Sequence, residues 1–109
     1  MPNQVQSRMT EKPYTTTRMA SGNLSLTISE ETSGESFPDE ARAFLNAVGG
    51  RLVLRTDTPV ERVWSVIIRW RPFWLAYDDF GGMTLDSIHS SCNSVVLALQ
   101  QESHQAAGT

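Results

Sequence analysis

Three segments of the chain show a clear pattern of hydrophobic and polar positions. In residues 23–29 (NLSLTIS), leucine and isoleucine alternate with serine and threonine, which predicts a half-buried strand near a sheet edge. Residues 51–56 (RLVLRT) predict a second strand. Between them, the apolar residues of 37–48 recur at i, i+4, i+7, i+8 and i+11, and this spacing predicts a helix with one apolar face. A proline in its first turn and the pair Gly49-Gly50 after its last residue mark the ends of that helix.

The segment 58–74 (TPVERVWSVIIRWRPFW) is the most aromatic part of the chain, because it holds all three tryptophans. Thr58, Pro59 and Glu61 match a helix-capping box with proline at the first helical position. Placed on a helical wheel, the apolar residues that follow span an arc of roughly 200°, and Pro72 ends the pattern. The β-branched and aromatic residues of VWSVII also suit a strand, but the cap and the segregated polar arc favour a central helix over 59–71.

The C-terminal part of the chain allows two interpretations. A helical period over 85–100 predicts a third helix, and the alternative is a short helix over 85–91 followed by a strand over 94–99. Residues 73–77 (FWLAY) could supply a third strand, as could a second copy of the chain.

The sequence therefore predicts an α+β fold. We expect a small single domain in which two or three strands pack against a central amphipathic helix and two further helices. The strand–helix–strand order of residues 23–56 is that of a β-α-β unit, with parallel and antiparallel pairing of the two strands both open.

The length of 109 residues suits one domain. We expect a disordered N-terminal arm over 1–21, a compact domain over 22–101 and a flexible tail over 102–109, because both ends lack apolar periodicity. A net charge of −3 argues against a general nucleic-acid binder. A single cysteine, the lack of a signal peptide and the lack of a long apolar run favour a cytoplasmic protein.

Candidate catalytic and metal-binding residues are few. Asp86, His89 and Cys92 are three apart, but Cys92 falls on an apolar stripe, where cysteine is most often a small buried hydrophobe. The carboxylates of Asp78, Asp79 and Asp86 suit a divalent cation, yet they lack the spaced oxygen ligands of a calcium loop. We therefore expect no enzymatic activity, no metal site and no cofactor.

The aromatic segment is the strongest candidate for a binding surface, because its apolar arc is broader than one small domain needs to bury. The alternative is a central helix covered on both sides within its own domain. Tryptophan and arginine are enriched in interface hot spots. The predicted interaction surface consists of Trp64, Ile67, Trp70, Phe73 and Trp74, and its basic rim consists of Arg62, Arg69 and Arg71.

This surface predicts a non-enzymatic protein-interaction protein with a regulatory or accessory role, acting as a homodimer or on another protein. Size alone suggests a viral or phage origin. The alternative is a nucleic-acid-binding protein that contacts phosphates through the arginines of 51–71. The arginine and tryptophan content of 69–74 also matches an interfacial membrane segment, which we favour less because nothing else in the chain suggests anchoring.

Overall fold

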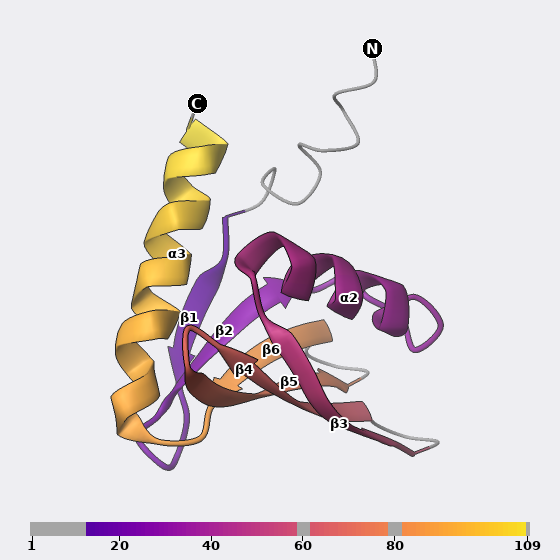
Figure 1. Cartoon of the computed structure of the whole chain (residues 1–109). Helices are drawn as coiled ribbons and strands as arrows, with labels where there is room; N and C mark the ends of the chain where they lie inside the picture. The colour runs from indigo at the N-terminus through magenta and orange to yellow at the C-terminus, as the bar shows by residue number, and fades with distance from the viewer. Residues whose placement is uncertain (1–12, 59–61, 79–81, 109) are drawn as a thin grey trace.

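The computed structural model describes residues 13–58, 62–78 and 82–108, and its central feature is one antiparallel sheet (Figure 1). Six strands lie in the order β1-β2-β6-β5-β4-β3, and every neighbouring pair is antiparallel. The strands are β1 (Thr15–Arg18), β2 (Leu24–Ser29), β3 (Arg51–Asp57), β4 (Arg62–Ile68), β5 (Arg71–Asp78) and β6 (Gly82–Ser87).

Among the described residues, two α-helices pack on one face of this sheet. Helix α2 (Phe37–Val48) connects β2 to β3, and helix α3 (Asn93–Gly108) follows β6 after a 3-10 turn over Ser90–Cys92. Helix α3 runs beside β1 and β2 (Figure 1), where its residue Asn93 accepts a hydrogen bond from the backbone N–H of Leu24 at 3.0 Å. Each helix thus covers a different part of the same sheet face.

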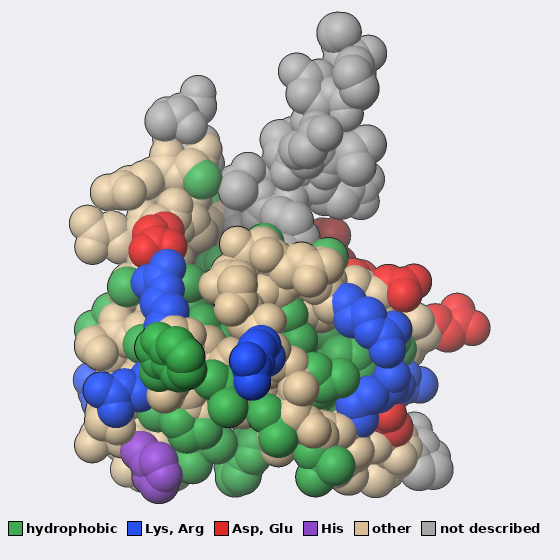
Figure 2. Space-filling view, in the orientation of Figure 1, with side chains coloured by type: hydrophobic (Ala, Val, Ile, Leu, Met, Phe, Trp, Pro, Cys, Tyr) green, Lys and Arg blue, Asp and Glu red, His purple; other side chains and the backbone are tan. Residues whose placement is uncertain are grey.

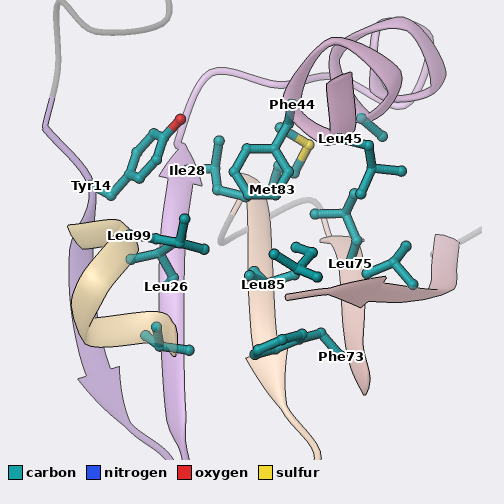
Figure 3. Close-up of a cluster of buried hydrophobic side chains, with 14 of the residues drawn as sticks. Tyr14, Leu26, Ile28, Phe44, Leu45, Phe73, Leu75, Met83, Leu85 and Leu99 are labelled. Atoms are coloured by element: carbon teal, nitrogen blue, oxygen red, sulfur yellow. The ribbon is translucent and has the colours of Figure 1, made fainter. Parts of the chain in front are cut away.

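The core lies between this sheet face and the two helices. Alternate residues of the strands point into it, which is why β2, β4, β5 and β6 show a two-residue rhythm of buried and more exposed positions. Figure 3 shows side chains from β2, β5 and β6 meeting Phe44 of α2 and Leu99 of α3. The largest fully buried side chains are Trp64, Phe37, Phe44 and Phe73.

The predicted central helix over 59–71 is wrong. Residues 62–68 form β4, which pairs with β5 through a two-residue turn, and the predicted fold of two or three strands with three helices gives way to a six-stranded antiparallel sheet with two α-helices. A strand that has apolar side chains on both faces produces a very broad apolar arc when it is drawn on a helical wheel. The β-branched and aromatic composition was therefore the better guide. Of the proposed capping box, Pro59 and Glu61 lie outside the described residues.

Other elements follow the sequence pattern closely. The helix over 37–48 is confirmed, and Gly49 ends it in a left-handed conformation (φ 72°) while its N–H donates to the carbonyl of Leu45. The strands expected over 23–29, 51–56 and 73–77 are confirmed as β2, β3 and β5. At the C-terminus, the helix predicted over 85–100 is confirmed from Asn93 onward and is wrong over 85–87, which belong to strand β6. Residues 90–92 form a 3-10 turn, and the alternative of a strand over 94–99 is wrong.

The crossover through α2 joins two strands that are not neighbours in the sheet, unlike the expected β-α-β unit. Strands β2 and β3 run in the same direction but are separated by β6, β5 and β4. Regular structure also extends into both predicted end segments, because β1 lies within 1–21 and α3 continues through 102–108. Residues 1–12 of the predicted arm lie outside the described residues.

Candidate protein-interaction surface

The face of the sheet opposite the two helices is uncovered in the described part of the chain, and we call it the open face. Its residues fall into two chemically different halves. The half formed by β1, β2 and β6 is polar: Thr15, Thr17, Ser25, Thr27, Thr84 and Asp86. The half formed by β3, β4 and β5, which we call the apolar half, carries Leu54, Val63, Ile67, Pro72, Trp74 and Ala76.

Trp74 stands at the border between the two halves of the open face. In register, it lies between Ser65 of β4 and Asp86 of β6. The Asp86 carboxylate accepts a hydrogen bond from the Ser25 hydroxyl at 2.6 Å, so the polar side of this border is internally bonded. The Trp74 side chain keeps 47 % of its surface exposed. A half-exposed tryptophan on an uncovered sheet face is a typical anchor for a binding partner.

Trp70 is exposed for a different reason. Arg69 and Trp70 form the two-residue turn between β4 and β5, with φ of 54° and 68°, the backbone of a type I′ turn. That turn normally takes asparagine and glycine, and a bulky residue in the left-handed region is a genuine outlier. The Trp70 side chain is 91 % exposed. The adjoining Arg69 forms an ion pair with Glu102 of α3 at 2.8 Å, which ties the turn to the C-terminal helix.

The structure divides the five residues of the predicted interaction surface between the surface and the core. Ile67, Trp70 and Trp74 lie on the open face or at its end, whereas Trp64 and Phe73 are fully buried. Both buried residues point to the helix side of their strands. Residues three apart lie on the same side of a helix. In a strand they point to opposite faces, because side chains alternate along it.

Trp64 is buried beneath aromatic and cationic side chains. Its ring meets Phe37 edge-on at 5.1 Å between centroids. The guanidinium carbons of Arg55 and Arg42 lie 4.6 Å and 5.7 Å from the Trp64 ring centre, within the range of cation–π attraction. The indole N–H donates to Asp57 at 3.3 Å. Trp64 therefore links β3, β4 and α2.

The predicted basic rim is split between separate places. Arg62 lies 3.9 Å from the Asp57 carboxylate, which also binds Arg55 at 3.0 Å. Arg69 pairs with Glu102, and Arg71 is exposed at the start of β5. Burial alone would raise the pKa of the Asp57 carboxyl. Hydrogen bonds from Trp64 and Arg55, together with the charges of Arg55 and Arg62, outweigh that effect and hold this pKa below its usual value.

The sequence analysis missed one exposed apolar element, the edge strand β3. Leu52, Val53 and Leu54 keep 39 %, 60 % and 61 % of their surfaces exposed. Three consecutive apolar residues in a strand show no alternation, and that lack of alternation was the only available signal. Figure 2 shows hydrophobic side chains gathered across the lower half of the molecule, below α2, with basic side chains among them and on both sides.

The candidate catalytic and metal-binding residues do not converge. Asp86 lies on the open face, His89 is exposed after β6, and Cys92 is buried with its thiol 3.3 Å from the Pro72 carbonyl oxygen. Within the described residues, no three His, Cys, Asp or Glu side chains are grouped so that they could hold a metal ion. Asp79, part of the predicted cation set, lies outside those residues.

Comparisons with family models, with curated proteins and with solved structures gave no significant match. Neither α2 nor α3 combines the length and the hydrophobicity that a bilayer-crossing helix requires.

Proposed function

We propose that this chain is a non-enzymatic protein-interaction protein that self-associates by packing the apolar half of its open face against that of a second copy. The observation that carries the proposal is the half-exposed Trp74 on a sheet face that neither helix covers, with Ile67 on the adjacent strand and Leu54 one strand further. Sheets commonly bury such faces by stacking about 10 Å apart on another sheet. Burial of apolar area contributes about 25 cal/mol per Å², before the costs of association are subtracted.

Charge placement favours a second copy as the occupant of the open face. Arg51 of β3 lies at one side of the apolar half, in register with Ile67, and Asp86 of β6 lies at the other side, beside Trp74. A two-fold axis parallel to the strands, above the boundary of β4 and β5, would bring each Arg51 near Asp86 of the second copy. The two positions differ by one pleat along the strand, roughly 7 Å, which an arginine side chain spans. Isologous interfaces repeat such a contact twice.

The nucleic-acid alternative receives less support from the same residues. Arg55 and Arg62 share Asp57, and Arg69 is paired with Glu102, so these three charges are partly neutralised. Trp64 is buried and offers no face for stacking on bases. A phosphate-binding groove would instead present unpaired basic residues in a row.

Sedimentation equilibrium of the wild type and of Trp74→Lys tests the proposal. We expect the wild type to dimerise in a concentration-dependent way and Trp74→Lys to remain monomeric, because a lysine at the interface centre would have to be desolvated. Leu97→Lys is the matched control, since Leu97 is 49 % exposed but lies on α3. It should dimerise like the wild type. A wild type that stays monomeric at all concentrations would refute self-association.

A charge exchange tests the orientation of the two copies. Arg51→Asp and Asp86→Arg should each weaken the dimer, and the double variant should recover most of the loss because each pair is restored with reversed polarity. If the double variant loses as much dimer affinity as the two single variants together, the proposed two-fold arrangement is excluded. The apolar contact is tested separately by Trp74→Lys.

A further inference from the structure

Strand β3 is an open edge of the sheet and differs from the opposite edge. In the described part of the chain, its seven residues pair only with β4. The other edge strand, β1, has four residues, and α3 lies along it, with Ser103 of α3 accepting a hydrogen bond from the backbone N–H of Tyr14 at 2.9 Å. An edge strand presents a row of backbone N–H and C=O groups that another strand can pair with.

The side chains of β3 do little to block such pairing. Folded proteins protect a sheet edge with lysine, proline, short strands or a covering element. Here the strand is long, has no lysine or proline, and places Leu52, Val53 and Leu54 at the surface. The register with β4 shifts between Leu52 and Leu54, so Val53 has no partner on β4. This bulge and the charged side chains of Arg51, Arg55 and Asp57 are the protection that the strand carries.

Arginine side chains surround this edge. Arg51 begins β3, and Arg55 lies near its end over the Trp64 ring. Arg42 of α2 approaches the same ring. Asp57 is the one acidic residue of the strand, and it is already shared between Arg55 and Arg62. The edge therefore combines an apolar centre with an excess of positive charge.

We propose that the β3 edge binds an extended segment of a partner protein by strand addition, and that this segment carries acidic side chains alternating with apolar ones. Backbone pairing with β3 would supply affinity, and side chains at alternate positions would supply specificity. Acidic side chains complement Arg42, Arg51 and Arg55, whereas a second copy of β3 would bring further arginines to the same edge. The peptide site shares Arg51 and Leu54 of β3 with the proposed self-association surface, so the two proposals are tested on different variants.

Fluorescence anisotropy with a short labelled peptide in which glutamate and valine alternate tests the proposal. The measurement is made on the Trp74→Lys protein, so that occupation of the open face does not interfere. We expect saturable binding, weakened about tenfold or more when lysine replaces glutamate in the peptide. Two further peptides carry N-methyl groups on the odd-numbered or on the even-numbered backbone nitrogens. Binding should be abolished in only one of them, the one whose methyl groups replace the N–H donors that face β3.

Protein variants locate the site. Val53→Glu should weaken peptide binding about tenfold or more because it places a like charge against the acidic peptide, whereas Thr17→Glu on the β1 edge should leave it unchanged. Circular dichroism and thermal unfolding confirm that both variants are folded. Equal binding of the glutamate and lysine peptides, equal loss in both protein variants, or no binding of any peptide would overturn the proposal. So would site-directed cross-linking that captures only β3 of a second copy.

Discussion

At the residue scale, Trp70 and Trp74 show two distinct causes of exposure. Trp74 is exposed because no described element covers its side of the sheet, whereas Trp70 is exposed because it occupies a hairpin turn. The left-handed backbone at Trp70 costs roughly 1–2 kcal/mol relative to an ordinary conformation. Strain of this kind persists where the rest of the fold imposes it, and it often marks a functional position.

Trp70→Gly should raise the free energy of unfolding. Relief of the left-handed conformation, about 1–2 kcal/mol, outweighs the added chain entropy of glycine, about 0.5–1 kcal/mol, so a net gain of about 0.5–1 kcal/mol is expected. Urea unfolding measures the change. Trp70→Ala removes the indole but keeps the Cβ, and its stability should stay near that of the wild type. A loss of stability in Trp70→Gly would mean that the indole contributes contacts that its exposure does not reveal.

Gly82 is a second residue whose backbone conformation matters. Its φ is 72°, and a Cβ at this position would collide with the Ser29 carbonyl oxygen and approach the Glu30 Cα at 2.7 Å. Gly82→Ala should therefore lower the free energy of unfolding by at least about 2 kcal/mol. Gly22 also has a positive φ, 92°, but an added Cβ there meets no atom within 4 Å. Gly22→Ala should cost only about 1 kcal/mol, and equal losses in the two variants would rule out the collision.

At the element scale, β3 and β4 are held together by the cluster of Asp57 with Trp64, Arg55 and Arg62. The carboxylate accepts hydrogen bonds from the indole and from Arg55, and Arg62 adds a longer electrostatic contact. Because the cluster joins the edge strand to the buried Trp64, it also fixes the position of the edge that we propose as a peptide site.

The Asp57 cluster predicts a pH dependence of stability. A carboxyl whose pKa is lower in the folded than in the unfolded protein stabilises the fold above the unfolded pKa, about 4, and loses that contribution as pH falls through the folded pKa. Wild type should therefore exceed Asp57→Asn in free energy of unfolding at pH 7, and the difference should shrink as pH falls below about 4. Urea unfolding across this range measures it. A difference that does not change with pH would show that the charge of Asp57 contributes nothing.

At the scale of the whole molecule, we propose two binding surfaces: the open face of the sheet and its β3 edge. They use different forces. The open face would bind through apolar side chains and a pair of charges, and the β3 edge through backbone hydrogen bonds. A chain that engaged both could hold a partner segment on each copy of a dimer. Ile67 and Trp74 on the open face, with Trp70 at its end, support an interaction role, which stays a prediction until the sedimentation and peptide-binding measurements are made.

The sequence by itself determined the elements whose pattern is local. The apolar stripe of α2 with Gly49 after it, and the alternation in β2, specify their own secondary structure, because one buried face and a terminal glycine leave few alternatives. The segment 60–74 carries more apolar side chains than the core buries, since Trp70 and Trp74 remain exposed. That these residues form an interface stays a prediction.

Only the tertiary structure decided how the aromatic segment folds and which tryptophan faces solvent. Trp64 and Trp74 differ in burial because β4 and β5 pair in a register that turns Trp64 toward Phe37 and Trp74 toward the open face. That register is fixed by pairing with strands β3 and β6, which lie on either side of this pair, and by burial of Trp64 under α2. A local pattern with apolar residues on two faces fits either a buried helix or a central strand, and pairing with neighbouring strands together with packing under the helices chooses between them.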